Sequence, residues 1–172
     1  AQFVHFVSKH CMDIRGLSEA TLEKFISLGY INDFKSIYRL SVHYNKLVEL
    51  DGFGMKSVQK LLLAIEKSRD VKLENFIVAL GIPNIGLSAA KTVSKACNGN
   101  WNKLWDMWNH EYDFTQLEDF GEVTASSLVD FFDEHINDID TLAAEMKFVL
   151  PEEYSYHSLE GLKFCITGSF SQ

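Results

Sequence analysis

The chain has 172 residues, 47% of them hydrophobic and 23% charged, which is enough for one ordinary domain or two small ones. No apolar run approaches the length of a membrane span and no leader peptide is recognisable, so we expect a cytoplasmic protein without membrane contacts. The net charge of −8 hides an uneven distribution: residues 1–105 carry 14 basic and 9 acidic side chains, and residues 106–160 carry 1 and 15.

The first predicted turn is IRGLS at residues 14–18, and a helix follows it with Leu22, Phe25 and Ile26 on one face. Gly29 is placed where a helix ends, and Asp33 and Ser41 can cap the helices that come after it.

The second turn is LDGFG at residues 50–54, preceded by a helical stretch over residues 42–50. The helix after it carries Val58, Leu61, Leu62 and Ile65 at helical spacing, on one face. The third turn is IPNIG at residues 82–86, between a helical stretch over residues 73–80 and a helix that ends near Gly99.

The fourth turn is LEDFG at residues 117–121, and the helix after it carries Ala125, Leu128, Val129 and Phe132. Residues 151–158 have little periodicity and are interpreted as a linker. A strand is predicted only at residues 164–167, and because a lone strand has no partner we expect a chain cut from a longer protein.

The four turns form a repeat, because their starts are 36, 32 and 35 residues apart. Each has an apolar first and fourth residue, and its third residue is Gly, Asn or Asp, which tolerate a positive φ. The sequence therefore predicts an all-α fold of four tandem helix-hairpin-helix motifs. We expect two pseudo-symmetric halves, at about residues 1–72 and 73–150, whose turns point to the same side within each half.

A glycine-rich turn that enters a helix presents backbone N–H groups and the positive end of the helix dipole to one point, which suits a phosphate. The residues predicted to contact a nucleic-acid backbone in this way are Gly16, Gly52, Gly54, Lys56, Ser57, Gly86, Ser88 and Lys91. Ser18 replaces the second glycine of the first turn. Carboxylates surround the fourth turn, which makes it the candidate for a purely architectural role. Because phosphates carry no sequence information, such binding is expected to be independent of sequence.

The motifs HFVS at residues 5–8, MDIRGL at 12–17, LDGFGMKS at 50–57 and ALGI at 79–82 with Ile85-Gly86 strongly resemble the helix-hairpin-helix domain of bacterial NAD-dependent DNA ligases. The resemblance covers roughly residues 1–150. The segment LEGLKFCITG at residues 159–168 looks like the opening strand of the BRCT domain that follows in that family, which gives a BRCT-like beginning at residues 159–172.

The resemblance implies a parent enzyme that seals nicks in replication and repair, with NAD, Mg and Zn as cofactors, and a four-cysteine zinc finger just before Ala1. The family's nucleophilic lysine lies in a Lys-x-Asp-Gly motif, but here Asp51-Gly52 follow Glu49-Leu50. We therefore expect this segment to have no catalytic residue and no cofactor of its own. Its expected partners are duplex or nicked DNA and other domains of the same chain.

Other candidate sites have simpler interpretations. The three cysteines lack a C-x-x-C spacing and are read as reduced thiols, and the six histidines show no metal-like spacing. Asp130, Asp133 and Glu134 could hold a divalent metal, although crowded acids on an exposed helix face are commoner. The tryptophans of residues 101–108 form one stripe at helical spacing, which we assign to the core. The Gly52-x-Gly54 spacing is superficially similar to a dinucleotide-binding motif. No predicted strand precedes it and no βαβ unit surrounds it, so we reject that interpretation.

Two other classes of function remain open. One is a different repair protein with tandem hairpins, such as a nuclease subunit or a junction binder. The other is a protein-interaction module in which the acidic part of the chain docks a basic partner and the hairpins serve only as architecture.

Overall fold

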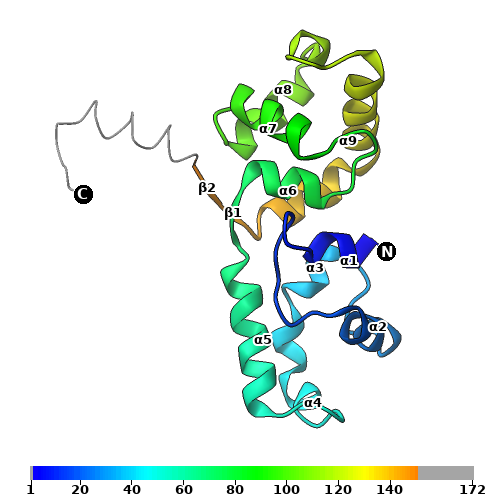
Figure 1. Ribbon diagram of the computed structural model, residues 1–172, viewed down its shortest axis with the longest axis vertical. Coiled ribbons are helices and arrows are strands. Elements are labelled where there is room, and N and C mark those ends of the chain that lie inside the picture. Colours follow the sequence, from blue (N-terminus) through cyan, green and yellow to red (C-terminus); the bar gives the residue numbers. More distant parts are fainter. Residues whose placement is uncertain (1, 151–172) are drawn as a thin grey trace, which may run out of the picture.

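The computed structural model describes residues 2–150, and this part of the chain is mostly helical, which confirms the predicted all-α class (Figure 1). Its first elements are α1 (Gln2–Val7), α2 (Glu19–Ser27), α3 (Phe34–Ile37), the 3-10 helix η1 (Leu40–His43), α4 (Tyr44–Leu47) and α5 (Met55–Lys67). They are followed by β1 (Asp70–Lys72), α6 (Leu73–Ala79), α7 (Leu87–Ala96), α8 (Trp101–Asn109), η2 (Phe114–Gln116), α9 (Glu122–Ala143) and β2 (Lys147–Val149). Among these helices, none is both long enough and apolar enough to cross a bilayer.

The helices are arranged along one long axis. Figure 1 shows α2, α4 and α5 at one end of the molecule, α7, α8 and α9 toward the other, and α1, α3 and α6 between them. One continuous hydrophobic core runs through both ends, and Phe6, Phe25, Phe76 and Phe132 are fully buried in α1, α2, α6 and α9. Complete burial of a phenylalanine side chain stabilises a fold by about 1.5–3 kcal/mol, so the core contributes to stability at both ends.

Two short strands pair in the middle of the molecule, which the sequence did not predict. β1 and β2 are parallel, with Asp70 opposite Lys147 and Lys72 opposite Val149. Three residues are too few for an alternating pattern to indicate a strand, and the partner strand lies more than 70 residues away, so the pairing is visible only in three dimensions. The strand predicted at residues 164–167, the linker at 151–158 and the BRCT-like segment lie outside the described residues.

Most of the predicted helix ends are confirmed. Asp33 caps α3, its Oδ1 accepting from the Ser36 N–H at 2.8 Å, and Gly29 and Gly99 have positive φ values of 80° and 70°. The prediction for Ser41 was wrong, because η1 already begins after Arg39 and has no side-chain cap. The helix predicted over residues 42–50 is instead η1 followed by the single turn of α4, which directs Leu40 and Leu47 into the core.

A set of ion pairs ties the end of α9 to the first part of the chain. Arg69 Nη1 donates to Glu145 Oε1 at 2.8 Å and to the Glu145 carbonyl at 2.9 Å, and Arg39 Nη2 donates to Glu145 Oε2 at 2.7 Å. The Arg69 guanidinium also lies 5.0 Å from the ring centroid of Tyr38. The Tyr38 hydroxyl is within 2.9 Å of Ser68 Oγ, and burial raises the pKa of Tyr38 to about 12. This Arg69–Glu145 clasp connects segments 76 residues apart in the sequence.

Replacing Glu145 by Gln should destabilise the fold, because both arginines lose a charged hydrogen-bond acceptor. We expect the free energy of unfolding at neutral pH to fall by about 1–2 kcal/mol, measured by chemical denaturation. Glu66→Gln is the matched control, since Glu66 contacts the same Arg69 but its side chain is 62% exposed. An equal loss in both variants would contradict a special role for Glu145.

The same clasp predicts a pH dependence. Burial raises the pKa of Glu145, but the hydrogen bonds and charges of Arg69 and Arg39 outweigh burial and hold that pKa below its usual range. The pKa of Glu145 is lower in the folded state than in the unfolded state, where a glutamate titrates at about 4.3. The stabilisation is therefore complete at pH values above the unfolded pKa, and it is lost as the pH falls through the lowered folded pKa. The stability difference between the wild type and Glu145→Gln should therefore shrink in acid, as measured by thermal unfolding at several pH values.

Candidate nucleic-acid interface

The four turns share a left-handed third residue. The third residue has a positive φ in every case, as predicted: 98° at Gly16, 83° at Gly52, 67° at Asn84 and 62° at Asp119. In the second, third and fourth turns the N–H of the fourth residue donates to the carbonyl of the first. These bonds are Phe53 to Leu50 at 2.9 Å, Ile85 to Ile82 at 3.1 Å and Phe120 to Leu117 at 3.1 Å. A positive φ at the third position of such a turn is the signature of type II.

The central apolar side chain of each turn packs against the core. Leu17, Ile85 and Phe120 are buried, and Phe53 is half-buried against Phe25, with their ring centroids 5.6 Å apart. The apolar side chain therefore fixes the turn from inside and leaves the glycine backbone at the surface.

Three of the four following helices begin without a side-chain cap. Gly54, Gly86 and Gly121 are the N-cap residues of α5, α7 and α9, and no atom lies within 4 Å of the place where a Cβ would be at any of them. The first N–H groups of these helices have no intrahelical acceptor and are open to a ligand. The first turn differs, because Ser18 Oγ accepts from the Thr21 N–H and so caps α2 internally.

The second turn places its predicted residues together at the surface. Lys56 and Ser57 are exposed in the first turn of α5, directly after Gly54. The Ser57 hydroxyl already contacts the backbone of its own turn, accepting from the Gly54 N–H at 2.9 Å and donating to the Gly54 carbonyl at 3.1 Å. The lysine and the first N–H groups of α5, after Gly54, therefore offer the more accessible donors.

The third turn presents a second group of this kind. Gly86 and Ser88 are exposed at the start of α7, and Lys91 lies three residues after Ser88, on the same face of the helix. The two groups, Gly52 to Ser57 and Gly86 to Lys91, belong to opposite ends of the elongated molecule.

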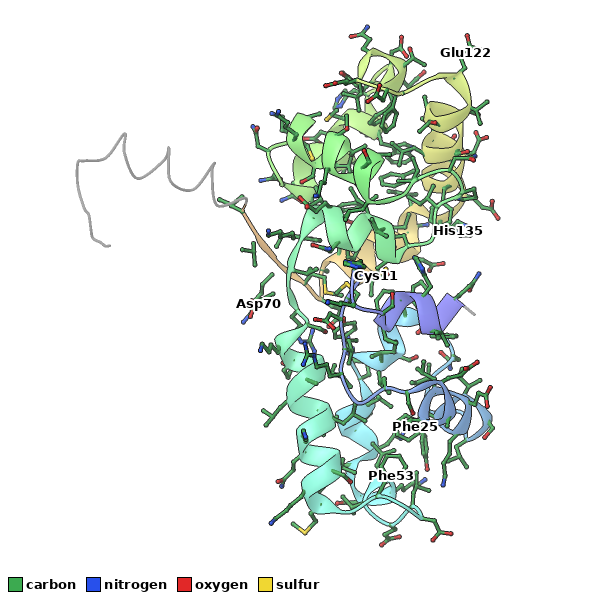
Figure 2. The ribbon with its side chains drawn as sticks, in the orientation of Figure 1. Cys11, Phe25, Phe53, Asp70, Glu122 and His135 are labelled. Carbon is green, nitrogen blue, oxygen red and sulfur yellow. The ribbon has the colours of Figure 1, made fainter. Side chains whose placement is uncertain are left out.

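The fourth turn is acidic, as the sequence indicated. Glu118, Asp119 and Glu122 are all exposed around the N-terminus of α9. Figure 2 shows Glu122 at one end of the long axis, and Phe53, from the second turn, at the other. The carboxylates of the fourth turn are thus far from Lys56, and they oppose the approach of a phosphate at their own end.

Contacts between neighbouring hairpins were not predicted. A Cβ on Gly16 would lie 3.4 Å from Leu61 of α5, so the first turn packs against the helix of the second. Lys24 of α2 reaches the second turn, and Ser127 of α9 contacts Asn84 of the third. No local pattern reveals these contacts, because they join residues 27 and 43 positions apart.

The remaining candidates are structural. Trp101 is buried, Trp105 and Trp108 are half-buried against the core, and the Trp108 indole N–H donates to Asp133 Oδ1 at 2.7 Å. The tryptophan stripe is therefore core, as predicted, and Asp133 has an indole partner. Within residues 2–150, no group of three or more His, Cys, Asp or Glu is placed to hold a metal ion.

Two cysteines are buried free thiols, Cys11 and Cys97, and burial raises the pKa of the Cys97 thiol to about 11. Cys165 lies outside the described residues. A cavity of about 760 Å³ lies between α1, α3 and α9 and is lined by Phe3, Phe34 and Phe131 among others, but by none of the eight predicted contact residues.

Comparison with known proteins identifies both the motif and the relatives. Residues 75–139 match the family model of the helix-hairpin-helix motif. The whole chain also matches proteins named DNA ligase. It is 35% identical to that of Ruminiclostridium cellulolyticum over 99% of this chain, and 38% identical to that of Persephonella marina over 99%. It is 40% identical to that of Finegoldia magna over 98%.

The chain is homologous to a segment of DNA ligases. It spans about a quarter of the length of these relatives, covering 26%, 24% and 25% of the three ligases. The helix-hairpin-helix match of residues 75–139 includes the third and fourth turns, which have the same backbone conformation as the second.

The positive φ of Gly52 predicts a specific sensitivity to substitution. Gly52→Ala should lower the free energy of unfolding by about 1–2 kcal/mol, because a Cβ is unfavourable in the left-handed region. Gly52→Asn should cost less, since Asn occupies the equivalent place in the third turn at a φ of 67°. Urea denaturation of the two variants measures both effects, and equal losses would show that the backbone conformation of this turn is not the cause.

Proposed function

We propose that this chain is the DNA-gripping part of an NAD-dependent DNA ligase, and that it binds duplex and nicked DNA through backbone phosphates, independently of sequence. The observation that carries the proposal is the pair of uncapped helix N-termini at Gly54 and Gly86, each followed by an exposed lysine. Glycine backbone, helix dipole and ammonium group together suit a phosphate. The homology to DNA ligases supports the choice of DNA as the partner.

In this proposal the ligation chemistry belongs to other parts of the parent enzyme. The chain lacks a Lys-x-Asp-Gly motif, so it would contribute no catalytic residue. Its role would be to hold the DNA substrate of a cytoplasmic enzyme of replication and repair. NAD, Mg²⁺ and Zn²⁺ would be bound by other domains of that enzyme. Those domains would be the second partner of this chain, beside DNA. NAD would supply the AMP that activates the 5′-phosphate of the nick.

The charge distribution indicates which surface of the molecule would face the DNA. Lys56, Lys60 and Lys67 are exposed along α5, and Lys91 and Lys95 along α7. The long helix α9, by contrast, carries exposed carboxylates from Glu122 onward. A duplex would therefore be drawn to the surfaces of the second and third turns and repelled from the fourth.

Lys56→Ala should weaken binding to a labelled nicked duplex equally for all sequences and should reduce the slope of log K against log salt by about one. Lys91→Ala should act in the same way at the third turn. Glu122→Gln is the matched control, and its binding should not weaken, because it removes a repulsive charge. Fluorescence anisotropy at several salt concentrations measures the affinities and their slopes.

Two outcomes would overturn the proposal. Unchanged affinity in both lysine variants would show that the turns are not phosphate sites. Absence of binding by the wild type at low salt would favour a protein-interaction module.

A further inference from the structure

Each lysine-bearing turn is contacted by the helix of its neighbouring hairpin. Lys24 Nζ, on α2, donates to the carbonyl of Asp51 at 3.4 Å, and Asp51 directly precedes Gly52. At the other end, Asn84 Nδ2 donates to Ser127 Oγ on α9 at 2.8 Å. Lys24 and Ser127 are each the sixth residue after the N-cap of their helix, Ser18 and Gly121. Equivalent helix positions therefore reach the same part of a neighbouring turn twice in one molecule.

The contacting helices belong to the two hairpins least suited to an anion. The N-terminus of α2 is already capped by Ser18, and that of α9 is surrounded by Glu118, Asp119 and Glu122. The turns they contact are followed by Lys56 and by Ser88 and Lys91. The first hairpin therefore contacts the second, and the fourth contacts the third. In each pair, one hairpin offers donors to a ligand and the other supports that hairpin.

The Lys24 contact acts on a particular peptide group. Type I and type II turns differ in the orientation of their central peptide, which in the second turn joins Asp51 to Gly52. In a planar trans peptide the C=O and the N–H point in opposite directions. A cation that holds the Asp51 carbonyl toward α2 therefore turns the Gly52 N–H away from α2. The positive charge also polarises this peptide and strengthens its N–H as a donor.

The lysine is itself held in place by packing. Its Nζ lies 5.9 Å from the ring centroid of Phe53, within cation–π distance, and Phe53 packs on Phe25, the residue after Lys24. In the third turn the contact with Ser127 holds Asn84 itself, the residue with the positive φ of 67°.

We propose that Lys24 and Ser127 are positioning residues, which fix the second and third turns in the backbone orientation that receives a DNA phosphate without contacting DNA themselves. This inference rests on the phosphate-binding function proposed above. It assigns the first and fourth hairpins a supporting role in the binding of DNA by the second and third.

Lys24→Met tests the inference, because it keeps the length of the side chain and removes its charge and donors. Affinity for a nicked duplex should fall roughly three- to tenfold, the equivalent of one hydrogen bond, while the salt slope should stay that of the wild type. Lys24→Arg should restore most of the affinity. Lys103→Met, on the exposed surface of α8, removes the same charge away from both lysine-bearing turns and is the matched control.

A second readout follows the peptide directly. In nuclear magnetic resonance, DNA should shift the Gly52 amide signal in the wild type and shift it much less in Lys24→Met. Ser127→Ala should likewise reduce affinity with an unchanged salt slope, and its DNA-induced shifts should be lost at the third turn while those at the second turn remain.

The outcomes separate this inference from the proposed function. If Lys24→Met binds as tightly as Lys103→Met, the supporting role is wrong although DNA binding stands. If the slope of log K against log salt falls by about one in Lys24→Met, Lys24 is a direct phosphate contact and not a positioning residue. If Lys56→Ala and Lys91→Ala leave both affinity and slope unchanged, the phosphate function itself fails, and the inference fails with it.

Discussion

The left-handed backbone at the third residue of each turn is the constraint on which the other features depend. It lets the chain reverse within a few residues, so that the next apolar side chain enters the core, as Leu17, Ile85 and Phe120 do. The same reversal brings the start of the following helix to the surface with a glycine at its N-cap in three of the four cases. Core packing and an open helix N-terminus are therefore produced by one local conformation.

The two ends of the molecule are held together by contacts of a different kind. The Arg69–Glu145 clasp and the pairing of β1 with β2 both lie where the end of α9 returns to the middle of the chain. Because these contacts are polar and directional, they fix the orientation of the two ends as well as their proximity. A ligand that contacts both the second and the third turn requires such a fixed spacing, since relative motion of the two ends would separate its contact points.

The sequence was sufficient for features that depend on neighbouring residues. The repeat placed all four turns, and the choice of Gly16, Gly52, Asn84 and Asp119 anticipated every positive φ at the third position. Asp33 was identified as a cap and the tryptophan stripe as core, because both follow from spacing within one helix. The homology to DNA ligases agrees with the resemblance seen in the motifs.

Features that depend on distant residues were missed. Nothing near Val71 indicates a strand, because its partner Phe148 is brought there only by the return of α9. Ser57 was chosen as a phosphate donor, and its contact with Gly54 depends on a side-chain rotamer that sequence alone does not determine. The contact of Lys24 was not predicted, since the turn it reaches lies 27 residues further on. The repeat located the four turns, but the contacts between repeats became visible only in the folded chain.

All three tryptophans of the chain lie in α8, at the end of the molecule formed by the third and fourth hairpins. The rings of Trp101 and Trp108 pack on Phe132, Trp105 packs on Trp108, and two of the indoles donate to carboxylates of α9. The emission of the tryptophans therefore depends on packing at that end. Intrinsic fluorescence is therefore a local probe of one end, whereas far-ultraviolet circular dichroism averages over every helix. Superimposable unfolding curves from the two signals would mean that the molecule melts as one cooperative unit, and displaced curves would resolve the order in which its ends come apart.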